Sequence, residues 1–441
     1  MKNFAYQTLY TKDEPLFEVK VFLFFLYSLI FSSNVLLQFK SMNASIGAIV
    51  VMILPFVFII TGVYYYNKIL VRFELNIIDV LVLITFFFPI YNGIMSYLTL
   101  GVPIKKMLMV LSARMYIVLT SFTYYLVRTN RLTVKEYVYG NILLCWFSML
   151  LYMYISLTQN PALYKDSLEE GLVGYNPSKG GYIFRFSSSF LYFGIIYYYL
   201  SYILNGSIFG LICWFILIAY QLFIDKGRSE LIAELIPLML YSVIILKWHQ
   251  LIKKMLLIFL LAAIMFGIAY WIDPRIVKFT ADMYMKFFEF FIGKKTGEGS
   301  ADMRWIEFGH IYDYFIKHPG QIFFGIGTPK KEDMYRYVGE VILSDTGIVG
   351  CVLANGIVGT ILLHLLLLHP IYVFLKVKHY KHDILFNTGI LGCLTVVIQS
   401  MFTGMFYYNP NALMIFIIIV EYYRVKEKFY WKSHPKLNIS T

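Results

Sequence analysis

Long apolar stretches recur along the whole chain and constrain its fold more than any other feature. With 59% hydrophobic and 15% charged residues, the chain departs from soluble globular domains, in which about a quarter of the residues are charged. About twelve segments of roughly 18 to 22 residues are long enough to cross a hydrocarbon core of about 30 Å. They begin at Val19, Ile46, Ile77, Met107, Tyr137, Ser187, Ser207, Leu231, Leu251, Thr346, Leu385 and Ala412. The sequence therefore predicts a polytopic integral membrane protein.

The fold class expected for these segments is all-α. A strand with an open edge in lipid would leave backbone groups unpaired, so each segment is predicted to be a helix. The alternating pattern of a membrane β-barrel does not occur. We expect residues 1–441 to form a single membrane domain with about 12 transmembrane helices, a large outer loop at 273–345 and a smaller outer loop at 158–186.

The short connections predict the orientation of the helices, because Lys and Arg collect on the cytoplasmic side. One alternating set of connections is rich in cations: Lys68, Arg72, Arg128, Arg131, Lys135, Lys247, Lys253, Lys254, Lys376, Lys378 and Lys381. The connection from Phe402 to Ala412 on the other side has none. Both termini are then cytoplasmic, and the first segment, which lacks a signal-peptide cleavage site, is predicted to be retained. The net charge of +12 fits an anionic inner leaflet, and no basic patch indicates nucleic acid.

The cysteines and acidic residues predict no cofactor. All four cysteines lie inside apolar segments, at Cys145, Cys213, Cys351 and Cys393. Their spacing fits neither a metal site nor a disulfide framework. No Asp-x-Asp pair occurs in the outer loops, so no metal is expected there.

Three outward connections stand out, at Thr158–Phe186, Asp225–Glu230 and Asp273–Asp345. Long loops in compact proteins are usually functional or disordered. Order is expected in the third loop, because Met283, Phe287 and Phe290 repeat at helical spacing.

A second helical pattern follows in the same loop. One face of this helix is predicted to carry an aromatic stripe of Trp305, Phe308, Tyr312 and Phe315. Glu307 and Asp313 are predicted to point away from this stripe, and Arg304 to lie at its edge. Both helices are expected along the outer membrane interface, and Gly320, Gly325 and Gly327 are expected to form turns.

Several arginines are candidate ligands for phosphate. Arg185, Arg228 and Arg304 lie on the predicted outer side, where each alone is most simply an interface anchor. Together they would suit a pyrophosphate, since the guanidinium fork binds phosphate bidentately and stays charged. Arg114 lies inside the fourth segment, where it needs a polar cavity, a partner or a path to the interface.

Two further polar residues lie inside apolar segments. His364 is expected to be a hydrogen-bonded core residue, and Glu234 is expected to partner an arginine.

Several short motifs follow one another in a characteristic order. A GRSE turn after an apolar segment precedes a long outer loop; Arg304 opens RWIEFGHIYDYFIKHPGQIFFGIG; SDTGIVGCVLANGIVG then enters the next segment. This order resembles that of the O-antigen polymerase and ligase superfamily. The resemblance covers roughly Ser207 to His369. It implies a fold like that of membrane glycosyltransferases of the third structural class, in the bacterial inner membrane. It also implies substrates that are glycans linked to undecaprenyl pyrophosphate, with a chain-length regulator and a flippase left open as protein partners.

Within this superfamily the residues favour a polymerase of oligosaccharide repeat units. Ligases that transfer the glycan to a lipid A core carry a His-Asn pair where this chain has Ser344-Asp345, although the polymerase pattern Arg-x10-Gly does not fit Arg185, Arg228 or Arg304 either. A ligase remains an alternative, and so does a polysaccharide flippase, for which broken helices near mid-membrane and short loops would be expected.

The resemblance implies metal-independent transfer of a growing glycan from its lipid pyrophosphate to a sugar hydroxyl. Arg185, Arg228, Arg304 and Arg114 are the candidate substrate-binding residues, because the leaving pyrophosphate needs its charge neutralised. A base within hydrogen-bond reach would assist the attacking hydroxyl. Asp345, Glu340 and His310 are the candidates, with Asp345 as a simple helix cap being the alternative.

Overall fold

The computed structural model describes most of the predicted membrane segments and most of the large loop. The described residues are 17–29, 77–102, 117–128, 131–158, 160, 173–176, 181–184, 189–225, 228–291, 299–329, 331–343, 346–403 and 411–433. A helix is present at each predicted segment apart from the one beginning at Ile46, which lies outside the described residues.

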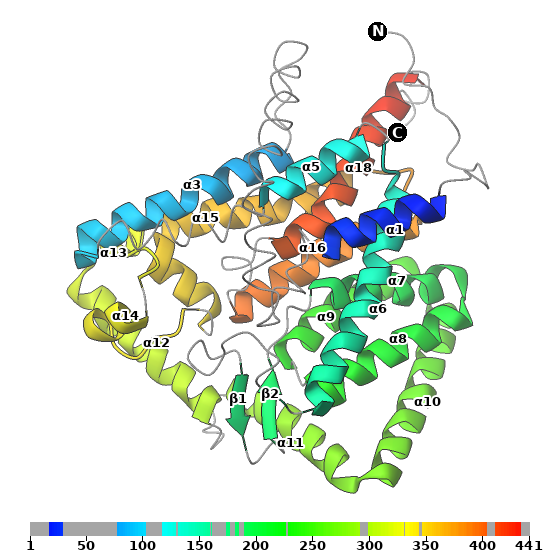
Figure 1. The fold of residues 1–441 in the computed structure, drawn as a ribbon, viewed down its shortest axis with the longest axis horizontal. Helices are drawn as coiled ribbons and strands as arrows, with labels where there is room; N and C mark the ends of the chain where they lie inside the picture. The colour runs from blue at the N-terminus through cyan, green and yellow to red at the C-terminus, as the bar shows by residue number, and fades with distance from the viewer. Residues whose placement is uncertain are drawn as a thin grey trace.

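The helices at these segments lie together in one bundle (Figure 1). They are α1 (Phe17–Tyr27), α3 (Ile77–Leu100), α5 (Ile117–Arg128), α6 (Val134–Thr158), α7 (Ser189–Asn205), α8 (Ile208–Tyr220), α9 (Arg228–Ile245), α10 (Trp248–Ile272), α15 (Gly347–Lys376), α16 (Ile384–Thr403) and α18 (Asn411–Ser433). Among the described residues, four helices are long and apolar enough to cross a membrane: α6, α10, α15 and α16. The helical prediction is confirmed for the described segments, and the architecture is that of a helical membrane protein.

Local sequence signals explain where two of the helices begin. Thr133 and Glu136 form a reciprocal cap at the start of α6, with Thr133 N donating to Glu136 Oε2 (2.7 Å) and Glu136 N to Thr133 Oγ1 (3.2 Å). This T-x-x-E pattern satisfies two backbone donors that the first turn would leave unpaired. At α11 (Pro274–Phe291) the side chain of Asp273 accepts from Arg275 N (2.9 Å), and Pro274 takes the first helical position, which it suits.

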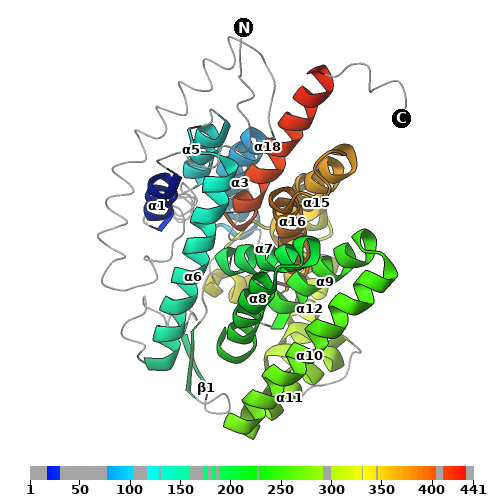
Figure 2. The same ribbon diagram turned by 90° about the vertical axis from the view of Figure 1, so that its right-hand side faces the viewer.

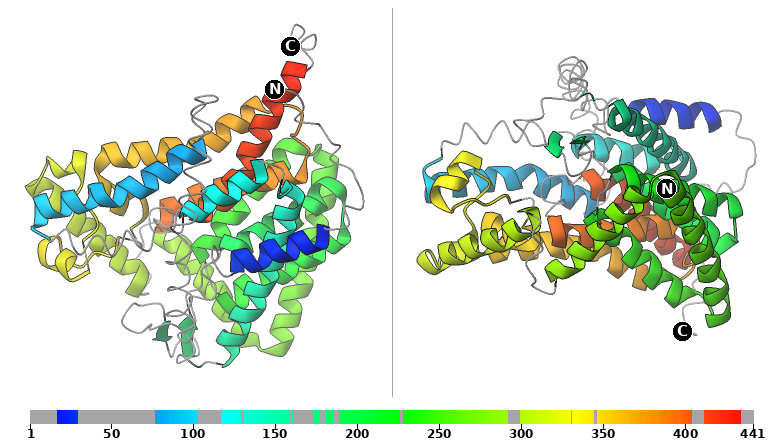
Figure 3. Two further views of the ribbon diagram at one scale, coloured as in Figure 1. Left: turned by 45° about the horizontal axis from the view of Figure 1, so that its top comes forward. Right: turned by 90° about the horizontal axis from the view of Figure 1, so that it is seen from below.

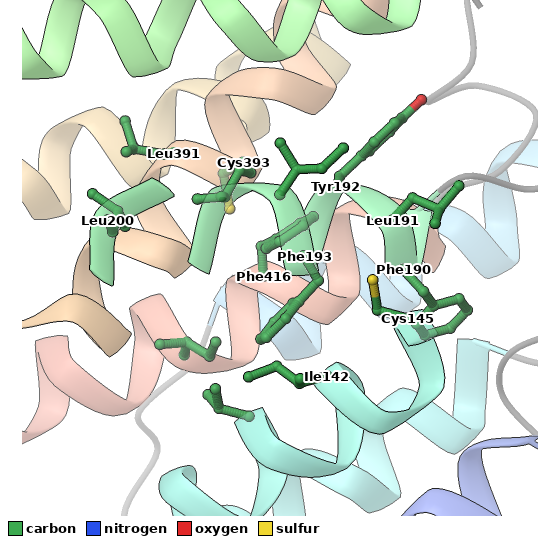
Figure 4. Close-up of a cluster of buried hydrophobic side chains, with 14 of the residues drawn as sticks. Ile142, Cys145, Phe190, Leu191, Tyr192, Phe193, Leu200, Leu391, Cys393 and Phe416 are labelled. Atoms are coloured by element: carbon green, nitrogen blue, oxygen red, sulfur yellow. The ribbon is translucent and has the colours of Figure 1, made fainter. Parts of the chain in front are cut away.

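Helix α16 lies at the centre of the bundle. It packs against α7, α9, α15 and α18 (Figures 1 and 2). Gly392 lets α18 approach closely, since a Cβ there would overlap the ring of Phe416. That ring in turn stacks on Phe193 of α7, with centroids 5.5 Å apart (Figure 4). Small residues and aromatic packing thus hold three helices together where lipid supplies no hydrophobic driving force between them.

Helix α10 lies at the edge of the bundle and exposes most of its apolar side chains. Trp271 is 86% exposed and Phe259 67%. An apolar face this large is unfavourable in water, so it indicates contact with lipid.

The segment 299–343 packs on one end of the bundle, and we call it the cap. It comprises α12 (Gly299–Lys317), α13 (Gln321–Phe324), α14 (Lys331–Tyr337) and the chain up to Leu343. A second apolar core joins it to the ends of α3 and α15 through Leu100, Val102, Ile311, Tyr314, Ile326, Met334, Val338, Val341 and Leu353. Figure 3 shows α3 and α15 side by side with the cap at their end. The helices expected at Met283–Phe290 and Trp305–Phe315 are confirmed.

The faces of α12 differ from the expectation in one respect. Trp305 and Tyr312 are 50% and 67% exposed, whereas Glu307 is only 3% exposed. Glu307 Oε1 accepts a hydrogen bond from Ile342 N at 3.3 Å. The expectation that Glu307 points away from the aromatic residues holds, but the face that carries it packs into the cap because this hydrogen bond compensates its burial.

A short hairpin lies within the loop predicted at 158–186. Strands β1 (Val173–Asn176) and β2 (Gly181–Phe184) pair antiparallel, with Val173 opposite Phe184. Strand β2 contacts α6. The hairpin lies outside the predicted membrane segments, so it does not conflict with their helical character.

Candidate functional site

Polar side chains gather where α9 packs against α16 and against the segment that follows α8. Glu234 of α9 is fully buried and accepts a hydrogen bond from Gln221 Nε2 at 3.0 Å. Gln399 of α16 is 1% exposed and donates through Nε2 to Glu230 Oε1 at 3.4 Å. We call Gln221, Glu230, Glu234 and Gln399 the acid cluster. Burying carboxylates within a bundle is costly, so groups of this kind mark functional sites in membrane proteins.

The backbone beside the acid cluster is irregular. Residues Gln221–Asp225, labelled η5, extend α8 as a π-helix. Such turns are rare and occur frequently at functional sites. Arg228, one of the candidate phosphate ligands, is the first residue of α9.

The start of α15 reaches the same end of α16. Gly347 has φ 56°, and a Cβ on it would overlap the carbonyl oxygen of Met401. Only glycine combines this backbone conformation with so close an approach. Since Met401 follows Gln399 by about half a turn, the acid cluster and the start of α15 share one end of the bundle. Asp345, two positions before Gly347 in sequence, lies outside the described residues.

The cap brings two of the candidate catalytic residues close together. His310 of α12 is half-buried, and a Cβ built on Gly339 would lie 2.8 Å from its Cγ. Glu340, the next residue, is exposed. Arg304 lies about two turns before His310 on the same helix and is half-buried. The cap core beside them contains Tyr314, where burial raises the pKa of the phenol above its usual 10.0.

Helix packing joins the cap to the acid cluster. Helix α11 contacts α9, η5 and α12, and α12 contacts α15. Helix α11 therefore connects the helix that begins at Arg228 with the cap that carries Arg304, His310 and Glu340. Arg185 and Arg114 lie outside the described residues, so convergence of the arginines stays a prediction.

Helix α15 is interrupted. Gly356 has φ 67° and ψ 174°, so the helix breaks there and then resumes. Two cap residues fill the break, because Ile326 N donates to Leu353 O (2.9 Å) and Gly327 N to Ala354 O (2.8 Å). We call residues 321–327, 353–356 and 91–99 the junction.

The opposite end of α15 carries an ion-pair network. Glu421 of α18 is fully buried and bonded to His369 Nε2 (2.8 Å) and Arg424 Nε (2.7 Å). Glu427 of the same helix is bonded to His379 Nδ1 at 2.9 Å.

Sequence reasoning missed several polar residues of the site. It named Glu234, whose hydrogen-bond partner is Gln221, but not Gln221, Glu230 or Gln399. Their signal was a carboxylate or amide at the ends of apolar segments, which is also typical of residues at the membrane interface. His364 is hydrogen-bonded as expected, through Nδ1 to Thr360 O at 2.7 Å.

The structure offers no obvious ligand set for a transition metal in the part of the chain that it describes. No group of three or more His, Cys, Asp or Glu residues there could hold a metal ion. All four cysteines are buried thiols.

No protein-family model matches the chain, and no curated protein matches it.

Proposed function

We propose that this protein is a membrane glycosyltransferase that polymerises oligosaccharide repeat units carried on undecaprenyl pyrophosphate, at the outer face of the bacterial inner membrane. One observation carries the proposal. A folded cap bearing Arg304, His310 and Glu340 packs on the ends of α3 and α15, and α11 connects it to α9 and to the buried acids beside η5. A site between a polar cap and membrane helices suits a substrate whose lipid remains in the bilayer while its glycan extends outward.

Contacts between helix ends support the two-sided arrangement that the proposal requires. Helix ends predicted to lie on the outer side contact one another: Gln399 donates to Glu230, and Gly347 packs on Met401. Ends predicted to be cytoplasmic also meet, as where Tyr241 OH donates to Lys381 O at 3.3 Å.

One contact joins a predicted inner end to a predicted outer end and does not fit this arrangement. Tyr137, near the predicted inner end of α6, donates through its hydroxyl to Ile415 O of α18 at 2.8 Å. Ile415 lies near the predicted outer end, so α18 must enter the bundle more deeply than a simple span at 412 implies.

The chemistry expected at this end is nucleophilic substitution at the anomeric carbon of the growing glycan. A sugar hydroxyl of the next unit attacks, the bond to the pyrophosphate oxygen breaks, and the hydroxyl proton passes to a base. Arg304 and Arg228 would neutralise the leaving pyrophosphate, a role for which the guanidinium fork is suited. Asp345, Glu340 or His310 would accept the proton.

Purified protein in liposomes with a synthetic lipid-pyrophosphate-linked repeat unit tests the proposal. A ladder of lipid-linked products is expected from the wild type. Arg304→Ala should shorten the ladder strongly, because a charge-assisted contact contributes about 1.5 to 3 kcal/mol. Arg275→Ala is the matched control, since Arg275 is 91% exposed in the same loop and pairs with Asp273. A product confined to single units, with protein folded and substrate intact, would contradict polymerisation.

A transporter of lipid-linked glycans is the second candidate, because the break in α15 is a feature of transport proteins. The same liposomes distinguish the two functions when the substrate is placed in the inner leaflet only. A transporter would move single units to the outer leaflet without extending them. Transfer to an added lipid A core in place of another repeat unit would indicate a ligase.

A further inference from the structure

The junction packs three chain segments together where α15 is broken. Gly356 permits this, because a Cβ there would overlap the carbonyl oxygen of Phe323 and its φ of 67° is unfavourable for other residues. Backbone that leaves the helix at membrane depth is tolerated only where protein or a polar cavity satisfies it. Here the N–H groups of Ile326 and Gly327 supply part of that satisfaction.

Helix α3 closes the third side of the junction. Ser96 Oγ donates to Ile326 O at 3.0 Å, and Tyr91 OH donates to Phe324 O at 2.6 Å. Between them, the backbone oxygen of Asn92 lies directly against Gly327. Cap, α3 and α15 are therefore fixed to one another by hydrogen bonds and close contacts that involve the cap backbone.

Three amide oxygens of the junction have no hydrogen-bond donor among the described residues. They are Asn92 Oδ1, Asn355 Oδ1 and Gln321 Oε1. Asn92 and Asn355 are each 2% exposed. The amide of Asn355 is oriented by a hydrogen bond from its Nδ2 to Cys351 Sγ at 3.0 Å, which leaves its oxygen free to accept.

The backbone of each of these residues lies in the junction. The backbone oxygen of Asn92 lies against Gly327, Asn355 directly precedes Gly356 in the chain, and the carbonyl of Gln321 accepts from Gly325 N at 2.7 Å. Buried acceptors left unpaired are rare in native structures, so three of them in one junction point to a ligand.

We infer that the junction binds an alkali-metal cation, Na⁺ or K⁺, through the amide oxygens of Asn92, Asn355 and Gln321. Hard cations take oxygen ligands. None of the three amide ligands carries charge, and neutral oxygens favour a monovalent over a divalent ion. Carbonyls at broken membrane helices coordinate such ions in transport proteins. The inference rests on α3, α13 and α15 alone and does not depend on the proposed glycan chemistry.

Thermal unfolding of the purified full-length protein in detergent tests this inference. The midpoint is measured in NaCl, KCl and choline chloride at equal ionic strength. A cation that binds only the folded state raises the midpoint in a saturable way. We expect a higher midpoint in NaCl or KCl than in choline chloride, and the more effective salt identifies the ion.

Substitutions locate the effect. Asn355→Ala and Asn92→Ala should each weaken cation binding about tenfold or more, because each removes a ligand to a charge. Asn387→Ala is the matched control: Asn387 is a fully buried amide of α16 whose oxygen also lacks a donor among the described residues, and it lies outside the junction. It should keep the wild-type cation dependence even if its midpoint falls.

Asn355→Asp covers the case in which the alanine variants fail to fold. A carboxylate at this position should bind the cation more tightly than the wild type does. Equal wild-type midpoints in all three salts would mean that water alone occupies the junction and would overturn the inference. Loss of cation dependence in Asn387→Ala would overturn it as well.

Discussion

Buried polar groups lie at both ends of α15, but the amide oxygens at the junction lack, within the described part of the chain, the hydrogen-bond partners that Glu421 at the far end has. At the junction, buried amides of Asn92 and Asn355 present oxygens that no described donor satisfies. At the far end, Glu421 is held between His369 and Arg424 at 2.8 and 2.7 Å. Glu421 has a partner on each carboxylate oxygen, whereas the three amide oxygens of the junction have none among the described residues. The difference indicates that the far end of α15 stabilises the fold and that the cap end is adapted for binding.

The largest effect on activity is expected at the entry to α15. Asp345→Asn should lower the rate of polymerisation by a factor of about 10² or more, the range for loss of a general base. Asparagine has almost the same shape as aspartate, and the N-cap residue of α15 is Thr346, so insertion and accumulation should stay normal. Analysis of the glycan ladder in cells would then show mainly single-unit product. Full-length polymer from this variant would mean that Asp345 is not the base.

The largest effect on stability is expected at the paired end. Glu421→Ala should lower the free energy of unfolding by about 3 kcal/mol, the lower end of the range for breaking a buried ion pair, because Arg424 retains some exposure. Denaturation of the purified protein measures this. Lys428→Ala, at an exposed position of the same helix, should change it by less than about 0.5 kcal/mol. A variant as stable as the wild type but inactive would reverse the roles of the two ends.

The helix break can be tested separately. Gly356→Ala should cost about 1 to 3 kcal/mol because the backbone there has a positive φ, and it should also abolish cation dependence of the midpoint. Gly267→Ala in α10 is the control, since nothing lies within 4 Å of the added Cβ. In a helix interior that change should be neutral or stabilise by up to about 1 kcal/mol. Equal effects of the two substitutions would argue against the break.

The smallest effect concerns the cap at alkaline pH. Burial raises the pKa of Tyr314, so the neutral phenol is favoured in the folded cap. The stabilisation is complete below the unfolded pKa of about 10 and is lost as pH rises toward the higher folded value. Tyr314→Phe should therefore reduce the alkaline loosening of the cap seen by hydrogen exchange. Tyr312→Phe, on the exposed face of α12, should leave it unchanged.

Much of the fold could be predicted from the sequence because lipid allows few solutions. Apolar length alone located the helices beginning near Ile77, Tyr137 and Leu385. Amphipathic spacing located α11 and α12. Periodicity could not show which face of α12 is buried, since the hydrogen bond from Ile342 N that lets Glu307 enter the cap comes from a residue far along the chain.

The site was less predictable. In the sequence LANGIVG, Gly356 is consistent with close helix packing as well as with a break in the helix. Only the approach of Phe323 distinguishes the two. Likewise, Gln221 and Gln399 are separated by most of the second half of the chain. Their roles follow from the packing of α8, α9 and α16, which no local pattern encodes.

The central claim is that the binding end of α15 lies toward the outer side of the membrane and its structural end toward the cytoplasmic side. Labelling of single cysteines with a membrane-impermeant maleimide tests this directly, and the four native cysteines, all buried, give little background. Cysteine is placed at Lys317 in the cap and at His382 beyond the paired end, both exposed. We predict that Lys317→Cys is labelled in intact spheroplasts and His382→Cys only after permeabilisation; labelling in the reverse order, or of both from one side, would contradict the claim.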